Sequence, residues 1–498
     1  MSVSGIGGSA SLSIQAVMDM RDRLDDLQRQ LGTGKKSTTY AGIGLDRGLT
    51  VGLRSQLSAL SGFQGTINHV GVRLDLMQTA LQQFAELTRN TKTLILNSQF
   101  VLHGATQTQE QKKAVSLLDE ALTLLSTRTD DRYLFSGREV DQPPVESGNA
   151  IINGEGLRAG LKQVIAERLA ADLGASGLGR LVVGGASPAV SLTEDAVSPF
   201  GFKLVGATSA LTGSTVTGPA GTPAALSVNL GANPSDGESI RFAFTLPDGS
   251  SEDVTLTATT SPTPGPGEFA IGATANDTAT NLRTALTGAL GALADTALTA
   301  ASAVAAGEDF FAIDDSDPPQ RVAGPPFDTA TAMIDGTEAN TVTWYVGDAG
   351  TDDPRSTALA RVDRSLTASY GARANERALR MTVQSFAVFA AMTFSDADPA
   401  AGARYAELQQ RLGAALVGTP TEQKITDIQG ELAGAQVALG AAKDRHQQTV
   451  STLQTLLQGA EGVTPEEVAT QILALQTSLQ ATLQTTSLLL QTNLLKYI

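Results

Sequence analysis

Hydrophobic residues near the start of the chain recur at steps of three and four. The first series is Val17, Met20, Leu24, Leu27 and Leu31. This spacing places apolar side chains along one stripe of an α-helix. Gly32 and Gly34 come directly after the series and are typical of a helix end. The pattern predicts a helix over about residues 12–31, with a coiled-coil-type seam that packs on another helix.

The same spacing returns elsewhere in both flanks of the chain. The series are Ile67, Val70, Leu74, Met77, Leu81 and Phe84; Val115, Leu118, Leu122 and Leu125; and Val450, Leu453 and Leu457 before Gly459. Each predicts an amphipathic helix whose apolar stripe is buried against neighbouring helices.

A strong helix start precedes the last series. Thr464 is a residue that can cap free helix amides, Glu467 can reach back to it, and Pro465 stands where a missing N–H costs nothing. The apolar positions that follow are Val468, Ile472, Leu475, Leu479 and Leu483. They predict a terminal helix that extends to within a few residues of Ile498. Its opposite face carries Gln and Thr in place of the usual Lys and Glu.

The middle of the chain follows a different period. Apolar residues alternate in 240–246 and again in 254–258, and Pro247-Asp248-Gly249 lies between the two runs. This arrangement predicts a β-hairpin. Asn276-Asp277-Thr278 then predicts the start of a short helix carrying Leu282, Leu286 and Leu290.

Charge separates the same middle segment from the flanks. The 498 residues include 51 acidic and 35 basic side chains, and 19 acidic but only 4 basic ones fall within 181–350. Subtraction leaves 32 acidic and 31 basic residues outside that segment, so nearly all of the net charge of -16 belongs to the middle.

These patterns together predict a mainly α protein with an inserted α+β domain. We expect terminal helices over 1–45 and 460–498, a helical rod domain over 46–180 and 346–459, and an acidic α+β insertion over 181–345. Long helices from both chain ends are expected to pack together. The low aromatic content, 4%, agrees with long packed helices more than with a typical enzyme core.

Several partners and transport routes are disfavoured. An acidic chain argues against nucleic acid and anionic membranes as main partners. No run of residues suggests a membrane span, and the N-terminus lacks the charged start and apolar core of a cleaved secretory signal. The chain has no cysteine, which excludes disulfides and cysteine nucleophiles.

Candidate chemical motifs all have a structural interpretation that we favour. Gly32 to Lys36 resembles a phosphate loop, but Arg29 stands where a glycine is needed, so a helix-ending turn is predicted. The three histidines, His69, His103 and His446, are too far apart in sequence to suggest a metal site and are expected to be solvated or to face a partner. Asp314, Asp315 and Asp317 could bind calcium weakly, although a solvated loop is favoured. No catalytic residue, cofactor or metal is predicted.

Four segments carry a resemblance to one protein family. Leu24 to Tyr40 resembles that family's first helix and the turn after it, and Gln471 to Ile498 resembles its terminal helix. Tyr133-Leu134-Phe135-Ser136-Gly137 is similar to a Tyr-Leu-Phe-Gly-Gly segment of that family, and Trp344-Tyr345-Val346-Gly347-Asp348 is similar to a Tyr-x-Gly-Asp strand that follows its variable region. The family is bacterial flagellin with its relative, the third hook-associated protein of the hook–filament junction, and the likeness covers roughly residues 10–145 and 344–498.

The resemblance implies a structural subunit of the extracellular bacterial flagellum, without enzymatic activity. Family members are exported unfolded, without a cleaved signal, through the type III export route. They polymerise through both terminal segments, while the variable middle projects outward. The implied partners are other copies in a helical homopolymer, other axial proteins of the hook-associated and cap types, and an export chaperone. Nucleic acid and membrane are not implied.

The assembly residues expected on this basis come from the first and last helices. They are Val17, Met20, Leu24, Leu27 and Leu31, together with Val468, Ile472, Leu475, Leu479 and Leu483. The end of the chain and the Tyr-Leu-Phe-Ser-Gly segment favour the junction protein, whereas the size of the insertion favours a filament subunit. An alternative is a secreted adhesive or binding module, in which the acidic domain acts and the helices form a stalk.

Overall fold

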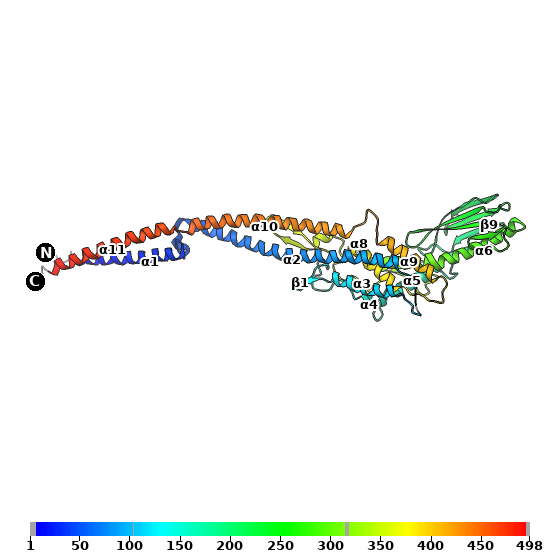
Figure 1. Ribbon diagram of the computed structural model, residues 1–498, viewed down its shortest axis with the longest axis horizontal. Helices are drawn as coiled ribbons and strands as arrows, with labels where there is room; N and C mark the ends of the chain where they lie inside the picture. Colours follow the sequence, from blue (N-terminus) through cyan, green and yellow to red (C-terminus); the bar gives the residue numbers. More distant parts are fainter. Residues whose placement is uncertain (1–5, 103, 314–317, 495–498) are drawn as a thin grey trace. The chain divides into compact units, whose positions relative to one another are not determined.

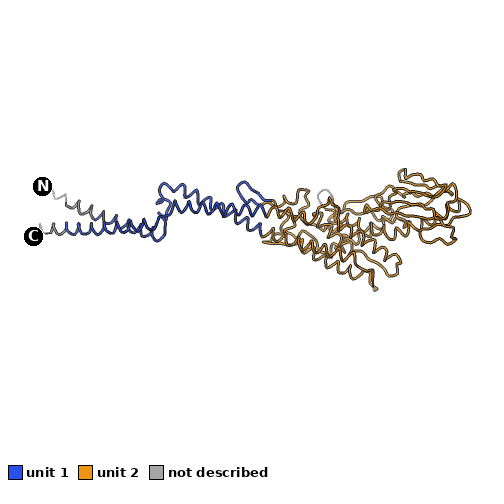
Figure 2. The backbone as a smooth tube through the Cα atoms, turned by 45° about the horizontal axis from the view of Figure 1, so that its top comes forward, with its two compact units in different colours: residues 1–71, 360–368, 437–498 blue, residues 72–359, 369–436 orange. Residues whose placement is uncertain are grey.

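A computed structural model of the protein describes residues 6–102, 104–313 and 318–494 (Figure 1). The chain forms two compact units, shown in Figure 2. Unit 1 comprises residues 1–71, 360–368 and 437–498, and unit 2 comprises 72–359 and 369–436. The predicted insertion, 181–345, lies within unit 2. The predicted terminal segments lie in unit 1, together with parts of the predicted rod segments.

About 52% of the protein is helical, and small sheets make up a β portion, so the fold is mixed α+β. Two helices are shared between the units, α2 (Arg47–Asn97) and α10 (Ile425–Glu461). Unit 1 also contains α1 (Ile6–Thr33), the 3-10 helix η1 (Tyr40–Asp46) and α11 (Pro465–Leu494). The helices of unit 2 are α3 (Gln109–Leu125), α4 (Gly148–Asn153), α5 (Leu161–Leu173), α6 (Ala275–Leu293), α7 (Thr299–Phe311), α8 (Arg377–Ala391) and α9 (Ala401–Ala415), with the π-helix η2 (Ala294–Leu298) and the 3-10 helix η3 (Pro354–Thr357).

Every predicted helical series lies in a helix, in α1, α2, α3, α10 or α11. The predicted stripe of α2 is buried from Ile67 to Phe84. Helix α11 begins at Pro465, as predicted, and the Thr464 hydroxyl donates to the Glu467 carboxylate at 3.2 Å. Glu467 therefore does reach back to the residue before the helix.

Two four-stranded sheets form the β portion of the insertion. Their strand orders are β10-β9-β8-β5 and β3-β4-β7-β6. The strands are β3 (Leu181–Gly184), β4 (Ala189–Glu194), β5 (Lys203–Ser209), β6 (Ser214–Ala220), β7 (Ala225–Leu230), β8 (Ser239–Thr245), β9 (Ser251–Thr259) and β10 (Glu268–Ala270). The predicted hairpin is confirmed, because β8 pairs with β9 in antiparallel register from Ser239 opposite Thr257 to Thr245 opposite Ser251.

The other described strands pair in short two-stranded sheets. They are β1 (Arg128–Thr129) with β2 (Arg132–Tyr133), β11 (Gln320–Val322) with β12 (Met333–Asp335), and β13 (Leu359–Arg361) with β14 (Thr367–Ser369). The last of these sheets is a hairpin with residues in both units.

Helix α6 packs on both four-stranded sheets and closes their core (Figure 1). Leu282, Leu286 and Leu290 are fully buried there, as the predicted helix requires. Thr274 caps the helix by accepting from the Asp277 amide, and the Asp277 carboxylate accepts from the Thr274 amide in return. The predicted helix is not short, however, because it continues through η2 into α7.

Helix α7 joins the insertion to the helices around it. Its side chains from Thr299 to Gly307 are buried, and it contacts α5, α8 and α9. Because this segment is buried against three helices, it lies in the core of unit 2. Its small alanine side chains allow these helices to approach closely. Within the described residues, the run Ala275–Phe311 is apolar and long enough to span a membrane, but 67% of its most apolar window is buried inside the fold.

The turn of the β8–β9 hairpin is attached to α9 by a buried arginine. Arg411 donates to the Asp248 carboxylate at 2.7 Å and to the Glu252 carboxylate at 2.9 Å. The Arg411 side chain is 7% exposed, so these bonds are largely shielded from water. The hairpin is thus held by α9 as well as by its own sheet.

Candidate functional site

Helices α1 and α11 lie side by side within unit 1 and run antiparallel (Figure 1). At the ends nearest the turns, the Val463 amide donates to the Gly34 carbonyl at 3.1 Å, and Lys35 pairs with Gly462 as an antiparallel bridge. Further along the pair, the Ser478 hydroxyl lies 3.8 Å from the Met20 sulfur. The seams predicted for the two helices therefore face each other within one chain.

Eight of the ten residues expected on this seam are buried or half-buried. Leu27 and Val468 are buried, and the half-buried ones are Val17, Met20, Leu24, Ile472, Leu475 and Leu479. Leu31 and Leu483 are each 44% exposed, so within this chain they do not belong to the buried seam. Thr482, rather than Leu483, continues the half-buried stripe of α11.

A further set of apolar side chains on this helix pair is exposed. Its members are Leu12, Ile14, Met18, Leu31, Leu473, Leu483 and Leu488, which we call the exposed apolar set. Leu473 is 65% exposed. A pair of helices can bury only one stripe of each, so apolar residues on the other faces remain in contact with water.

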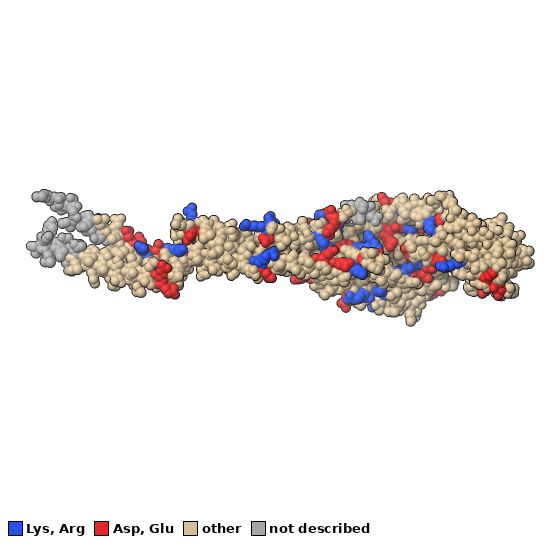
Figure 3. Space-filling model, turned by 90° about the horizontal axis from the view of Figure 1, so that it is seen from above, with Lys and Arg blue, Asp and Glu red and all other residues tan. Residues whose placement is uncertain are grey.

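The helix pair also lacks charge over much of its length. Helix α11 has no Asp, Glu, Lys or Arg from Val468 to Leu494, and α1 has none from Ile6 to Met18. On the face shown in Figure 3, the described surface beside the grey atoms is accordingly tan. Exposed helix faces of monomeric proteins normally carry charge. An uncharged surface with exposed leucines is typical of one that is covered by another protein.

A polar cluster secures the turns that join this helix pair to the rest of unit 1. Glu461, at the end of α10, has a nearly buried carboxylate, 6% exposed, that accepts from Arg54 of α2 at 2.7 Å and lies 3.8 Å from the Lys35 amino group. The Glu461 carbonyl also accepts from the Lys36 amide at 2.7 Å. We call Glu461, Arg54, Lys35 and Lys36 the junction cluster.

The junction cluster explains the Gly-Thr-Gly-Lys-Lys segment. Helix α1 ends at Thr33, and Gly34 has a φ of +68°, which favours glycine. Both lysines then contact the end of α10, since the Lys36 amino group donates to the Ala460 carbonyl at 3.0 Å. The predicted helix-ending turn is confirmed. Sequence patterns did not indicate Arg54 or Glu461, because neither belongs to an apolar stripe or a motif.

In unit 2, the structure brings together the two short segments that carry the resemblance there, Tyr133–Gly137 and Trp344–Asp348. The Asp348 amide donates to the Ser136 carbonyl at 3.0 Å, and the Asp348 carboxylate accepts from the Arg138 amide at 3.3 Å. Gly137 has a φ of +64°, and a Cβ there would lie 2.6 Å from the Asp348 side chain. Glycine is therefore required at this position for both conformation and space.

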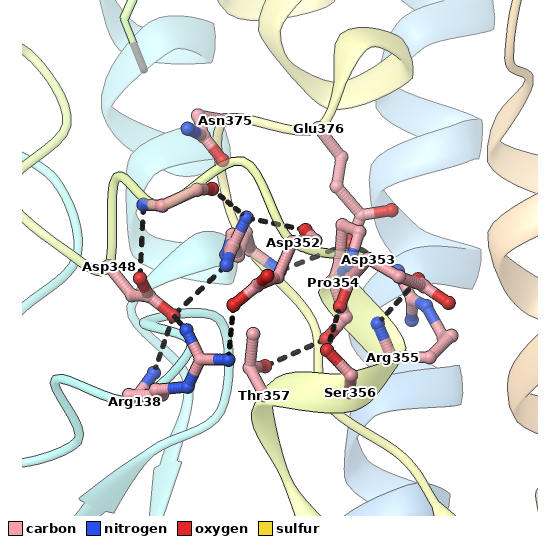
Figure 4. A network of polar contacts seen from close by, with 12 residues as sticks. Arg138, Asp348, Asp352, Asp353, Pro354, Arg355, Ser356, Thr357, Asn375 and Glu376 are labelled. Atoms are coloured by element: carbon pink, nitrogen blue, oxygen red, sulfur yellow. Dashed lines mark hydrogen bonds and ion pairs between the residues drawn. The ribbon is translucent and has the colours of Figure 1, made fainter. Parts of the chain in front are cut away.

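Charged side chains extend this contact into a network (Figure 4). Asp348 accepts from Arg373 at 3.1 Å and lies 3.3 Å from Arg138, and Arg138 also bonds Asp352 at 2.6 Å. Arg355 pairs with the buried Glu376. Burial raises the pKa of Asp348, but the Gly350 amide and Arg373 lower it by more, so its pKa is below the ordinary value. These contacts hold three loops of unit 2 together.

A second ionic cluster in unit 2 is short of positive charge. Arg168 of α5 bonds the fully buried Asp172 at 3.0 Å and Asp309 of α7 at 2.5 Å. Burial raises the pKa of Asp309 to about 6, against the lowering effect of Arg168. One guanidinium thus serves two carboxylates in a poorly hydrated place.

This shift predicts a pH dependence of stability. Because the folded pKa of Asp309 exceeds its unfolded value, the stability gained from its protonated form is complete below about pH 4 and is lost as pH rises through 6. Between pH 4.5 and 7, the free energy of unfolding should therefore fall by about 2 kcal/mol less in Asp309→Asn than in the wild type. Urea unfolding followed through Trp344, the single tryptophan and a buried residue of unit 2, measures it at pH 4.5 and 7.

The matched control is Asp253→Asn, since Asp253 belongs to the same unit but pairs with an exposed arginine, Arg241. It should keep the wild-type difference between pH 4.5 and 7. An equal difference in wild type and Asp309→Asn would show that another group is responsible.

The sequence offered three histidines and one acidic run as candidate ligands for a metal ion. In the described ranges, no group of three or more His, Asp and Glu side chains could hold a metal ion. Asp314, Asp315 and Asp317 lie outside the described residues, as does His103. His69 is exposed, whereas His446 is buried and packs against Phe63 of the neighbouring helix, with ring centroids 5.9 Å apart.

No model of a known protein family matches the chain, and no curated protein matches it either. The assignment of a function therefore depends on the exposed apolar set and on the uncharged length of the terminal helices.

Proposed function

We propose that this protein is a structural subunit of the flagellin family, which polymerises through α1 and α11 into the extracellular flagellar filament or its hook–filament junction. In this proposal the arrangement is flagellin-like, with both terminal helices in the inner core of the polymer and the acidic insertion on its outside. It is exported to the outside of the cell and acts with other axial proteins and an export chaperone. The proposed role in motility is structural, with no catalysis.

The observation that carries the proposal is the exposed apolar set on a helix pair that has no charged residue from Ile6 to Met18 in α1 or from Val468 to Leu494 in α11. Within one chain, Leu473 and Leu483 contact water, although burying a leucine side chain gains about 1.5–3 kcal/mol. Packing of identical helix pairs against one another would cover them, and α11 contributes no charged side chain to that contact from Val468 to Leu494. Contacts that join different surfaces of identical subunits, and that do not close into a ring, build a helical filament.

The proposal is tested by placing charge in the exposed apolar set. In the double variant Leu473→Lys/Leu483→Lys, each monomer should remain folded because both positions are exposed. Assembly should fail, with a critical concentration raised by more than about 100-fold, since two apolar contacts are replaced by buried charges. Sedimentation measures this, and electron microscopy of the wild type distinguishes a long tube from a short ring or sleeve.

The matched control is Val182→Lys/Val205→Lys, which changes two exposed valines on the strands β3 and β5 of unit 2. It should assemble as the wild type does, because the insertion is expected to project from the polymer. If the wild type never polymerises, or if the leucine variant polymerises normally, the proposal is wrong. The alternative of an adhesive module on a helical stalk would then be favoured.

A further inference from the structure

The sheet formed by β10, β9, β8 and β5 has an incomplete edge. Strand β10 pairs with β9 only over residues 257–259, so residues 251–256 have a neighbouring strand on one side, which is β8. At one end of the β8–β9 ladder, the Ala258 amide donates to the Glu238 carbonyl at 2.7 Å. Because bonded residues alternate along an antiparallel pair, the even-numbered residues of β9 are the ones that bond β8.

The odd-numbered residues of this open stretch direct their backbone groups away from β8. They are Ser251, Asp253 and Thr255, whose amides and carbonyls have no hydrogen-bond partner among the described residues. All three residues are exposed. A row of free strand amides and carbonyls is a template for pairing with another strand. The stretch is about 17 Å long, which suits an added strand of about five residues.

A cavity of about 570 Å³ lies beside the open edge, between β9 and α6. Residues 253–255 form one wall, and residues 265–268 line the cavity at the β10 end. Helix α6 packs along the sheet (Figure 1) and lines the cavity with Ala285, Gly288, Ala289 and Ala292. Because these side chains are short, they leave room for the side chains of an added strand. We call the open edge with this cavity the β9 groove.

The charge of the β9 groove favours a basic occupant. Its lining includes two carboxylates, Asp253 and Glu268, and no Lys or Arg. Arg241 pairs with Asp253, whereas Glu268 has no basic partner among the described residues. The segment around the groove, 181–350, holds 19 acidic and only 4 basic residues. This field attracts a basic segment and steers it toward the groove.

A second copy of the chain is disfavoured by the same charges. Antiparallel pairing of two β9 edges would bring the Asp253 carboxylates of both copies into one groove, and like charges on paired strands are destabilising. Both copies would also carry the acidic excess of 181–350. The occupant that suits the groove is therefore a different protein of opposite charge.

We propose that the β9 groove binds an extended basic segment of another protein, which adds a strand to the sheet beside β9. The backbone of this segment pairs with Ser251, Asp253 and Thr255, and every second side chain lies over α6 and is uncharged. Lys or Arg residues at its ends lie near Asp253 and Glu268. The groove belongs to unit 2 and does not depend on assembly through α1 and α11.

Hydrogen exchange of the dilute full-length chain tests the groove with the capped peptide Lys-Val-Thr-Val-Thr-Val-Lys. At about 1 mM peptide and a Kd of about 0.1 mM, the amides of Ser251, Asp253 and Thr255 should exchange about tenfold more slowly. Unchanged exchange of these three amides would overturn the proposal. Their protection in the free protein, at concentrations where sedimentation shows a dimer, would overturn it as well, because a second copy would then cover the edge.

Two altered peptides separate charge from backbone pairing. One has Glu in place of both Lys residues, and the other keeps the Lys residues but carries N-methyl groups on its five central amides. Each should bind at least about tenfold more weakly by titration calorimetry, because the first is repelled by the groove and the second cannot donate to the strand edge. Wild-type affinity of the Glu peptide would exclude a basic occupant, and that of the N-methyl peptide would exclude an added strand.

The variant that fills the groove is Gly288→Tyr. A Cβ atom at Gly288 would meet no other heavy atom within 4 Å, so the variant should fold, and its ring should weaken binding of the Lys peptide at least about tenfold. The matched control is Thr280→Tyr, which adds the same ring at an exposed position of α6 outside the groove and should bind as the wild type does. Normal binding by Gly288→Tyr would show that the peptide binds elsewhere. A chain that fails to polymerise would leave these results unaffected.

Discussion

Arg373→Gln is expected to destabilise unit 2 by about 3–5 kcal/mol, because the change breaks a buried ion pair from one side. The Arg373 side chain is 4% exposed, and it bonds the Asp348 carboxylate at 3.1 Å and the Asp352 carbonyl at 2.9 Å. Glutamine supplies neither the charge nor the reach, so Asp348 loses its buried partner. Urea unfolding followed through the fluorescence of the buried Trp344 measures the free energy of unfolding.

Arg138→Gln is the matched control for this prediction, since Arg138 contacts the same carboxylate from the solvent side. Its charge is screened by water, so a much smaller change is expected. If both variants lost the same free energy of unfolding, the number of positive charges around Asp348 would matter and the burial of the arginine would not. No loss in Arg373→Gln would show that the network does not stabilise unit 2.

The helical elements could be predicted because apolar spacing is a local signal. Steps of three and four in the series from Val17 and from Val468 require only that each helix buries one stripe. The hairpin at 240–258 could also be predicted from the sequence, because the apolar alternation and a turn with Gly249 occur within twenty residues. The spacing cannot specify which residues of an apolar stripe are buried. Leu31 and Leu483 belong to the predicted stripes, yet both are exposed.

The ionic networks could not be predicted, because they join residues far apart in the chain. Arg373 and Asp348 meet Arg138 across more than 200 positions, and Arg411 meets Asp248 across more than 160. A charged residue has no periodicity that identifies its partner. The resemblance drew attention to Tyr133–Gly137 and to Trp344–Asp348, but the contact between Gly137 and Asp348 required the structure.

The extent of the insertion also depends on tertiary packing. Its start and end are marked by charge, yet α7 is buried against α5, α8 and α9, which lie outside 181–345. Alanine-rich segments have weak apolar periodicity, so the sequence did not show that the helix beginning at Ala275 continues into this core. Removing 181–345 would therefore expose the centre of unit 2, and point variants are the better test of function.

Reversing the charge of Glu461 is expected to open the junction cluster. Glu461→Lys places a third cation beside Arg54 and Lys35, where the wild-type carboxylate is 6% exposed. The loss is about 3 kcal/mol, because a nearly buried charge is left facing like charges. The amides of Lys36 and Val463, which donate to the Glu461 and Gly34 carbonyls, should then exchange about 100-fold faster.

Glu466→Lys is the matched control, since it reverses an exposed acid in the first turn of α11, five residues away. It should leave both amides protected. If Glu461→Lys leaves them protected as well, the cluster does not hold the turns. Because α1 and α11 form the proposed assembly surface, the opened variant should also raise the critical concentration for polymerisation. Faster amide exchange in Glu461→Lys without a change in the critical concentration would mean that the junction cluster stabilises the fold but is not needed for assembly. The helix pair would then be restored by packing against its neighbours in the polymer.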